Sequence, residues 1–95
     1  MTGTTRSSEG LDARRRRLLY RSWHRGTREM DLIMGRFADA RVGTLTDAEL
    51  GDFERLSEEP EPDIYAWITG ERPVPVEHDT AVFRELRIFA RGDDK

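Results

Sequence analysis

The chain has 95 residues, of which 36% are hydrophobic and 37% charged, with a formal net charge of −3 and no cysteine. That length suits one small domain with a modest core, and the composition is that of a folding chain, not a disordered one. The lack of cysteine excludes disulfides, thiolate metal sites and thiol nucleophiles, and no apolar run approaches the roughly 18 residues of a membrane-spanning helix. We therefore expect a soluble domain without direct membrane insertion.

Charge is distributed unevenly along the chain. Fifteen of the sixteen basic residues are arginine, concentrated in the first half, and acidic residues fill the stretch 49–63. Such an asymmetry can orient a binding partner, although codon bias in a GC-rich genome also explains the excess of arginine over lysine.

The two ends of the chain differ from the region between them. Residues 1–10 form a small polar tail that contains Glu9 and no apolar stretch, which is unlike a secretory signal, and residues 93–95 form a second tail. We expect residues 11–92 to form a single domain, and we expect a cytoplasmic protein of a bacterium.

Two helices are predicted in the first half. The first runs from about 11 to 23 and ends before Gly26. The second shows apolar residues at i, i+3, i+4, i+7 and i+8, and fades near 42–43. The residues expected on their inner faces are Leu11, Leu18, Leu19 and Ser22 for the first helix, and Met30, Ile33, Met34, Phe37 and Ala38 for the second.

The third helix has a distinct start signal. Thr46 and Glu49 have the spacing of a capping box, in which the threonine is the N-cap and the glutamate is at N3. Leu45 and Leu50 are placed to form a hydrophobic staple across the same turn.

Two more helices follow. The fourth is expected to begin with Pro62 at its first position and to end at Gly70, and the fifth to cover about 79–91. The apolar spacing of the fourth helix places Trp67 in the core. No segment alternates with period two, so the predicted fold is an all-α, compact five-helix bundle.

The connection between the first two helices, residues 25–29, has two interpretations. In the structural interpretation, Gly26 supplies a positive φ at the helix end. Arg25 then lies at the negative end of the first helix dipole, and Glu29 lies at the positive end of the second. In the functional one, Trp23 and His24 are displayed beside these charges, and the corner anchors a partner.

The basic run Arg14–Arg17 also has two interpretations. Consecutive residues point around a helix, so a solvated face is expected, with nucleic acid or an acidic protein as the alternative partner. A net acidic domain is a poor nucleic-acid binder, because that affinity depends on neutralising phosphates.

Catalytic and metal-binding chemistry is not indicated. His24 and His78 are the only histidines and have no metal-ligand spacing, and no glycine-rich phosphate loop is present. Ser22 or Thr27 near His24 would need a pocket and an oxyanion site to act as nucleophiles. We therefore expect that the protein is not an enzyme and that it has no catalytic residue, no metal and no stably bound cofactor.

Two segments nevertheless resemble a known family. The run Arg25-Gly26-Thr27-Arg28-Glu29-Met30-Asp31 resembles the RGxRExD signature of the SdhE family, the succinate dehydrogenase assembly factors that promote covalent flavinylation. The later run Pro62-Asp63-Ile64-Tyr65-Ala66-Trp67-Ile68 is similar to that family's PDxxxW helix, and the similarity covers about 14–89.

The resemblance implies a five-helix protein without catalytic activity of its own. It would bind the flavoprotein subunit of succinate dehydrogenase, and in some members that of fumarate reductase, as a monomer, while the FAD belongs to the partner. The protein-binding residues it implies are Arg25, Gly26 and Glu29, then Arg28 and Asp31, with Trp23 and His24 added by their location.

Two rival functions remain open from the sequence. One is a nucleic-acid-binding module that uses the basic helix, which would show steep salt dependence. The other is a carrier that binds FAD directly, which would need a pocket with apolar walls.

Overall fold

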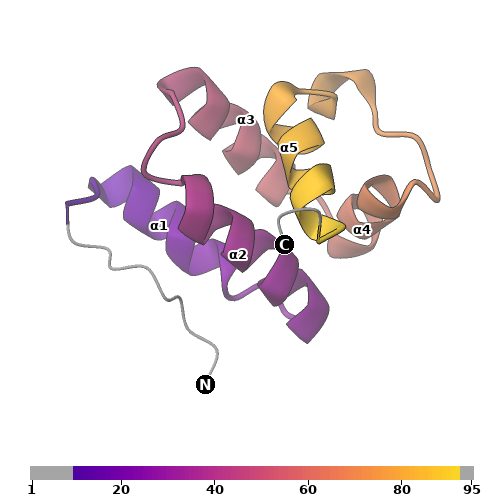
Figure 1. Cartoon of the computed structure of the whole chain (residues 1–95), viewed down its shortest axis with the longest axis horizontal. Coiled ribbons are helices and arrows are strands. Elements are labelled where there is room, and N and C mark those ends of the chain that lie inside the picture. Colours follow the sequence, from indigo (N-terminus) through magenta and orange to yellow (C-terminus); the bar gives the residue numbers. More distant parts are fainter. Residues whose placement is uncertain (1–9, 93–95) are drawn as a thin grey trace. The chain divides into compact units, whose positions relative to one another are not determined.

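A computed structural model describes residues 10–92, and within this range the chain forms five α-helices, one short 3₁₀-helix and no strand (Figure 1). The prediction of an all-α, five-helix protein is confirmed. None of the helices in the described range has the length and hydropathy to cross a membrane. The α-helices are α1 (Ala13–Ser22), α2 (Arg28–Arg41), α3 (Asp47–Ser57), α4 (Glu61–Thr69) and α5 (Ala81–Ala90).

The described chain divides into two compact units, one that ends at Leu45 and one that begins at Thr46. The first contains α1 and α2, and the second contains the other helices. Apart from Gly10, the predicted tails 1–10 and 93–95 lie outside the described residues. The extent of a single domain over 11–92 stays a prediction.

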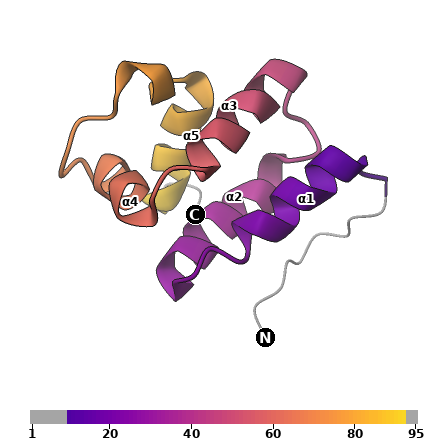
Figure 2. The same cartoon turned by 180° about the vertical axis from the view of Figure 1, so that it is seen from behind.

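In the first unit, α1 packs along α2, as both views show (Figures 1 and 2). Each helix begins at a side-chain cap, because the first backbone N–H groups of a helix have no partner within it. The carboxylate of Asp12 accepts from the backbone N–H of Arg15 at 2.8 Å, and the hydroxyl of Thr27 accepts from that of Met30 at 3.2 Å. The bond from Arg15 holds the pKa of the Asp12 carboxyl below its usual value of 3.8.

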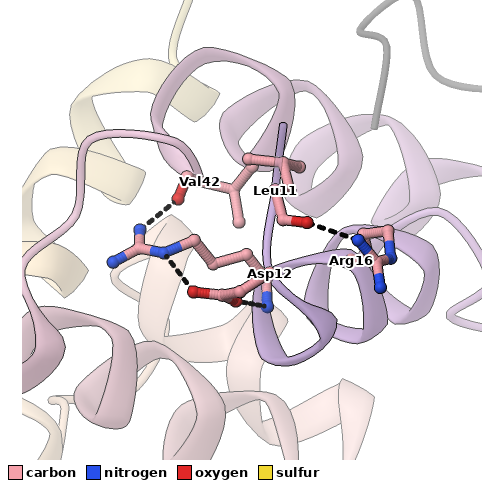
Figure 3. A network of polar contacts seen from close by, with 5 residues as sticks. Leu11, Asp12, Arg16 and Val42 are labelled. Carbon is pink, nitrogen blue, oxygen red and sulfur yellow. Dashed lines mark hydrogen bonds and ion pairs between the residues drawn. The ribbon is translucent and has the colours of Figure 1, made fainter. Parts of the chain in front are cut away.

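Arg15 and Arg16 of the basic run on α1 make polar contacts within this unit (Figure 3). The Arg15 side chain is only 16% exposed; its Nη1 donates to the carbonyl of Val42, 2.5 Å away, and its Nε lies 3.4 Å from the Asp12 carboxylate. Arg16 donates to the carbonyl of Leu11. The expectation of a purely solvated face is therefore wrong for Arg15, because its guanidinium caps the C-terminal end of α2.

Replacing Arg15 should have a measurable effect on stability. We expect Arg15→Gln to lower the free energy of unfolding by about 1–2 kcal/mol, because a part-buried carbonyl loses a charged donor. Arg17 on the same helix is exposed and provides the control: Arg17→Gln should change the free energy of unfolding by less than about 0.5 kcal/mol. Urea denaturation of both variants gives the comparison, and equal midpoints would show that the Arg15 contacts contribute nothing.

In the second unit, α5 packs against both α3 and α4. The capping box predicted for α3 is confirmed, since the backbone N–H of Glu49 donates to the Thr46 hydroxyl at 3.1 Å and that of Thr46 donates to the Glu49 carboxylate at 2.9 Å. Leu45 and Leu50, the predicted staple residues, are both buried.

Three helix starts differ slightly from prediction. α1 begins at Ala13, two residues after its predicted start near 11, because Asp12 takes the N-cap position. α4 begins at Glu61, one residue before Pro62, because Pro60 takes the N-cap position. Its predicted end is confirmed, since Gly70 is the C-cap after Thr69, with a left-handed φ of 85°. α5 begins at Ala81 because the 3₁₀-helix η1 (Val76–His78) precedes it and Thr80 caps its first turn.

A histidine joins two parts of the second unit. His78 is buried, and its Nε2 lies 2.9 Å from Oε2 of Glu59, in the loop between α3 and α4. Its ring stacks on Trp67 of α4, with 5.6 Å between the ring centroids. Trp67 is buried, which confirms its predicted place in the core.

Candidate functional site

The turn between α1 and α2 is built around a glycine. α1 ends at Ser22, α2 begins at Arg28, and Gly26 between them has a φ of 114°. A side chain at this φ meets the backbone sterically, so glycine is strongly preferred there. The positive φ predicted for Gly26 is confirmed.

An aspartate of α2 closes this turn. Oδ1 of Asp31 accepts a hydrogen bond from the backbone N–H of Arg25 at 2.5 Å, and the backbone N–H of Asp31 itself donates to the carbonyl of Thr27 at 2.9 Å. With Thr27 as the N-cap of α2, these bonds hold the connecting backbone in one conformation. Asp31 thus acts on the position of Arg25, and its carboxylate faces into the turn.

Two charged side chains of the motif, those of Arg28 and Glu29, lie on the surface. Both are in the first turn of α2, whereas Arg25, in the turn before this helix, is half-buried. An acid in the first turn of a helix is favoured by the helix dipole, which supports the structural interpretation of Glu29. The same exposure makes Arg28 and Glu29 accessible to a partner, and opposite charges on a fixed backbone favour specific recognition.

Trp23 does not lie on the surface of the corner as the functional interpretation expected. It is 6% exposed, and its Nε1 donates to the carboxylate of Asp39 at 3.1 Å. Its ring lies against Gly35 of α2, where a Cβ would come within 2.3 Å of Cδ2 of the indole. The indole therefore packs α1 onto α2, while its part in partner binding stays a prediction.

His24, in contrast, is exposed as expected. Its ring stacks on that of Tyr20, with 3.9 Å between centroids and 14° between planes, and its Nδ1 lies 2.7 Å from the Tyr20 carbonyl. The structure thus brings an exposed aromatic pair to the end of α1, immediately before Arg25.

Sequence reasoning missed three residues of this corner: Tyr20, Gly35 and Asp39. A glycine inside a helical pattern costs about 1 kcal/mol relative to alanine and indicates a close packing contact, so Gly35 carried a usable signal. The hydrogen bond from Trp23 to Asp39 spans 16 residues, and no local sequence pattern indicated it. Within residues 10–92, no three histidine, aspartate or glutamate side chains gather as a metal site would require.

The glycine of the turn allows a direct test of this geometry. We expect Gly26→Val to lower the free energy of unfolding by more than about 1 kcal/mol, because a β-branched side chain is strained at positive φ. Gly43→Val is the control, since Gly43 is exposed and is not among the positive-φ glycines. Thermal melting that gives the same midpoint for Gly26→Val and wild type would contradict the assigned turn.

Known proteins share most of this chain. The family model described as "Flavinator of succinate dehydrogenase" matches residues 16–90. The chain is 41% identical over 80 residues to the FAD assembly factor SdhE of Acetobacter pasteurianus, which covers 84% of this chain and 73% of that protein. It is 36% identical to the mitochondrial succinate dehydrogenase assembly factor 2 of Dictyostelium discoideum, over 87% of this chain and 59% of that protein. It is 37% identical to the corresponding protein of Scheffersomyces stipitis, over 95% of this chain and 63% of that protein. The chain thus spans about three-fifths of these two mitochondrial relatives.

Proposed function

Because this chain belongs to the family of succinate dehydrogenase flavinators, we propose that it is an assembly factor for the flavoprotein subunit of succinate dehydrogenase. It binds this subunit and promotes covalent attachment of FAD to it. The observation that carries the proposal is the match over residues 16–90, which includes the whole corner between α1 and α2.

The corner is the docking site in this proposal. Arg28 and Glu29 are exposed there and Arg25 is half-buried, which supports direct contact of these side chains with the partner. Gly26 and Asp31 serve the same site indirectly, because they fix the backbone that carries Arg25. His24 is exposed at the same end of α1 and extends the contact.

The mechanism is preorganisation of the partner. The flavin supplies the reactive chemistry, and the nucleophile is a histidine of the flavoprotein subunit. A bound helper that holds this histidine and the flavin in reactive geometry accelerates the reaction, since orientation contributes several kcal/mol. The chain then acts without catalytic residues and without holding FAD itself.

We further propose that the free chain is a monomer in the cytoplasm of a bacterium. Its partners include the flavoprotein subunit of fumarate reductase, by the resemblance described above. FAD is contacted by the partner and not by this chain.

Coexpression tests the proposal directly. The flavoprotein subunit of succinate dehydrogenase from the same genome is expressed with and without this chain, and covalent flavin is measured by in-gel fluorescence. We expect the signal to increase several-fold with the chain present. An equal signal in both samples, together with no co-purification, would refute the assembly-factor role.

The nucleic-acid alternative has little support. Two of the four arginines in the basic run, Arg15 and Arg16, donate to backbone carbonyls, and the net charge is −3. Tight non-specific binding requires several arginine or lysine side chains directed at phosphates. The assembly-factor role also accounts for the match over residues 16–90, which a nucleic-acid module does not.

A further inference from the structure

A stripe of exposed side chains runs along α1 and ends at the corner. Its helical members, Arg17, Tyr20 and Arg21, are spaced at i, i+3 and i+4, which places them on one side of α1. His24 follows the end of α1 and joins them because its ring stacks on that of Tyr20. Tyr20 is 64% exposed, one of the most exposed large hydrophobic side chains in residues 10–92. α1 contains no acidic residue, so this stripe is basic and aromatic.

The aromatic part of the stripe is held in place before any partner arrives. The rings of Tyr20 and His24 stack at 3.9 Å, and the His24 ring is also hydrogen-bonded to the backbone through Nδ1. A side chain that is already ordered loses less conformational entropy when it is buried in an interface. Tyrosine and arginine are also the residue types enriched at the centres of interfaces.

The stripe differs from the rest of the basic run. Arg15 and Arg16 are bonded to the carbonyls of Val42 and Leu11, and these contacts stabilise the unit itself. Arg17 and Arg21 are exposed on the face that Tyr20 shares. Stability of the first unit therefore explains Arg15 and Arg16, but it does not explain an exposed tyrosine flanked by two exposed arginines.

We propose that this stripe, Arg17, Tyr20, Arg21 and His24, is a second part of the docking surface and binds an acidic surface segment of the flavoprotein partner. The inference rests on the proposed function. Two features favour this occupant: the stripe carries only positive charge, which selects an acidic surface, and it is continuous along the chain with Arg25 of the corner. The Tyr20–His24 pair packs against an apolar side chain within that acidic segment.

A protein surface fits the stripe better than a nucleic acid does. Two exposed arginines beside one ring pair neutralise few phosphates, whereas tight nucleic-acid binders make about 6–10 such contacts. One or two ion pairs around an aromatic anchor are the usual arrangement of a protein interface.

The test measures the affinity of purified chain for the purified flavoprotein subunit at low and at high salt. We expect Tyr20→Ala to weaken binding about 10-fold or more at both salt concentrations, because it removes an apolar anchor. Tyr20→Phe retains the ring and should bind nearly as wild type. Arg17→Glu combined with Arg21→Glu should weaken binding about 10-fold or more at low salt and much less at high salt, because exposed charges are screened.

Controls separate the outcomes. Arg91→Glu reverses the charge of one exposed arginine in the second unit and should bind as wild type. Circular dichroism and melting establish that each variant is folded. If the stripe variants bind normally while Glu29→Ala does not, the stripe proposal is wrong and the proposed function stands. If wild type fails to bind the flavoprotein at all, both fail. If the wild-type chain binds a random duplex oligonucleotide as tightly as the flavoprotein, and the stripe variants lose that binding, the acidic-protein assignment is overturned.

Discussion

Glu29→Ala is expected to yield a folded protein that no longer promotes flavinylation of its partner. As an acid in the first turn of α2, Glu29 contributes at most about 1 kcal/mol to stability, so the melting temperature should change little. As part of a desolvated charged contact in the docked complex, its truncation should weaken binding by about 2–5 kcal/mol. Melting, partner pull-down and covalent-flavin yield on the same preparation measure both effects.

Two variants make this result specific. Asp47→Ala removes an exposed acid from the first turn of α3 and should leave flavinylation unchanged. Glu29→Gln keeps the shape of the side chain and removes its charge, so a loss as large as that of Glu29→Ala would assign the effect to charge. A folded Glu29→Ala protein with a normal yield of covalent flavin would instead limit Glu29 to its role at the helix start.

Trp23→Ala should strongly destabilise the first unit. It removes a nearly buried indole from its contact with Gly35 and breaks the hydrogen bond to Asp39. Truncating a buried tryptophan costs about 3–5 kcal/mol, a large share of the roughly 5–15 kcal/mol of a whole domain. We expect the melting temperature to fall by more than about 10 °C.

A second substitution separates packing from partner contact at this position. Trp23→Phe keeps an aromatic ring over Gly35 and loses only the N–H donor to Asp39, so it should be much less destabilised than Trp23→Ala. If packing is the role of Trp23, partner binding should fall only as far as the folded fraction falls. A Trp23→Ala protein that melts like wild type but does not bind would show that the indole contacts the partner.

Helix ends are the part of the fold that local sequence predicts best. The Thr46–Glu49 capping box and the glycine that ends α4 are both predicted by short residue patterns, and the structure contains both. These features depend on residues three or four positions apart, so their geometry follows from the helix itself. The starts of α4 and α5 are displaced by one or two residues from their predicted positions, because Pro60 and Thr80, and not the expected residues, take the N-cap positions.

The sequence predicts the candidate site as a set of residues and not as an arrangement. The motif places Arg25 and Gly26 at the turn between two helices and Glu29 at the start of the second, and the structure has them there. The motif does not distinguish residues that face outward from those that face inward. Glu29 is exposed, whereas the carboxylate of Asp31 is turned toward the backbone N–H of Arg25.

Local sequence thus accounts for the all-α class, most helix boundaries and the left-handed glycines, because capping, apolar periodicity and φ preferences act over a single turn. Tertiary structure alone decided that Trp23 is buried, that Arg15 caps α2 and that His78 pairs with Glu59. The hydrogen bonds concerned join Trp23 to Asp39, Arg15 to Val42 and His78 to Glu59, which are 16, 27 and 19 positions apart. They form only when helices pack at a particular distance and angle, and the period of an apolar face determines neither quantity.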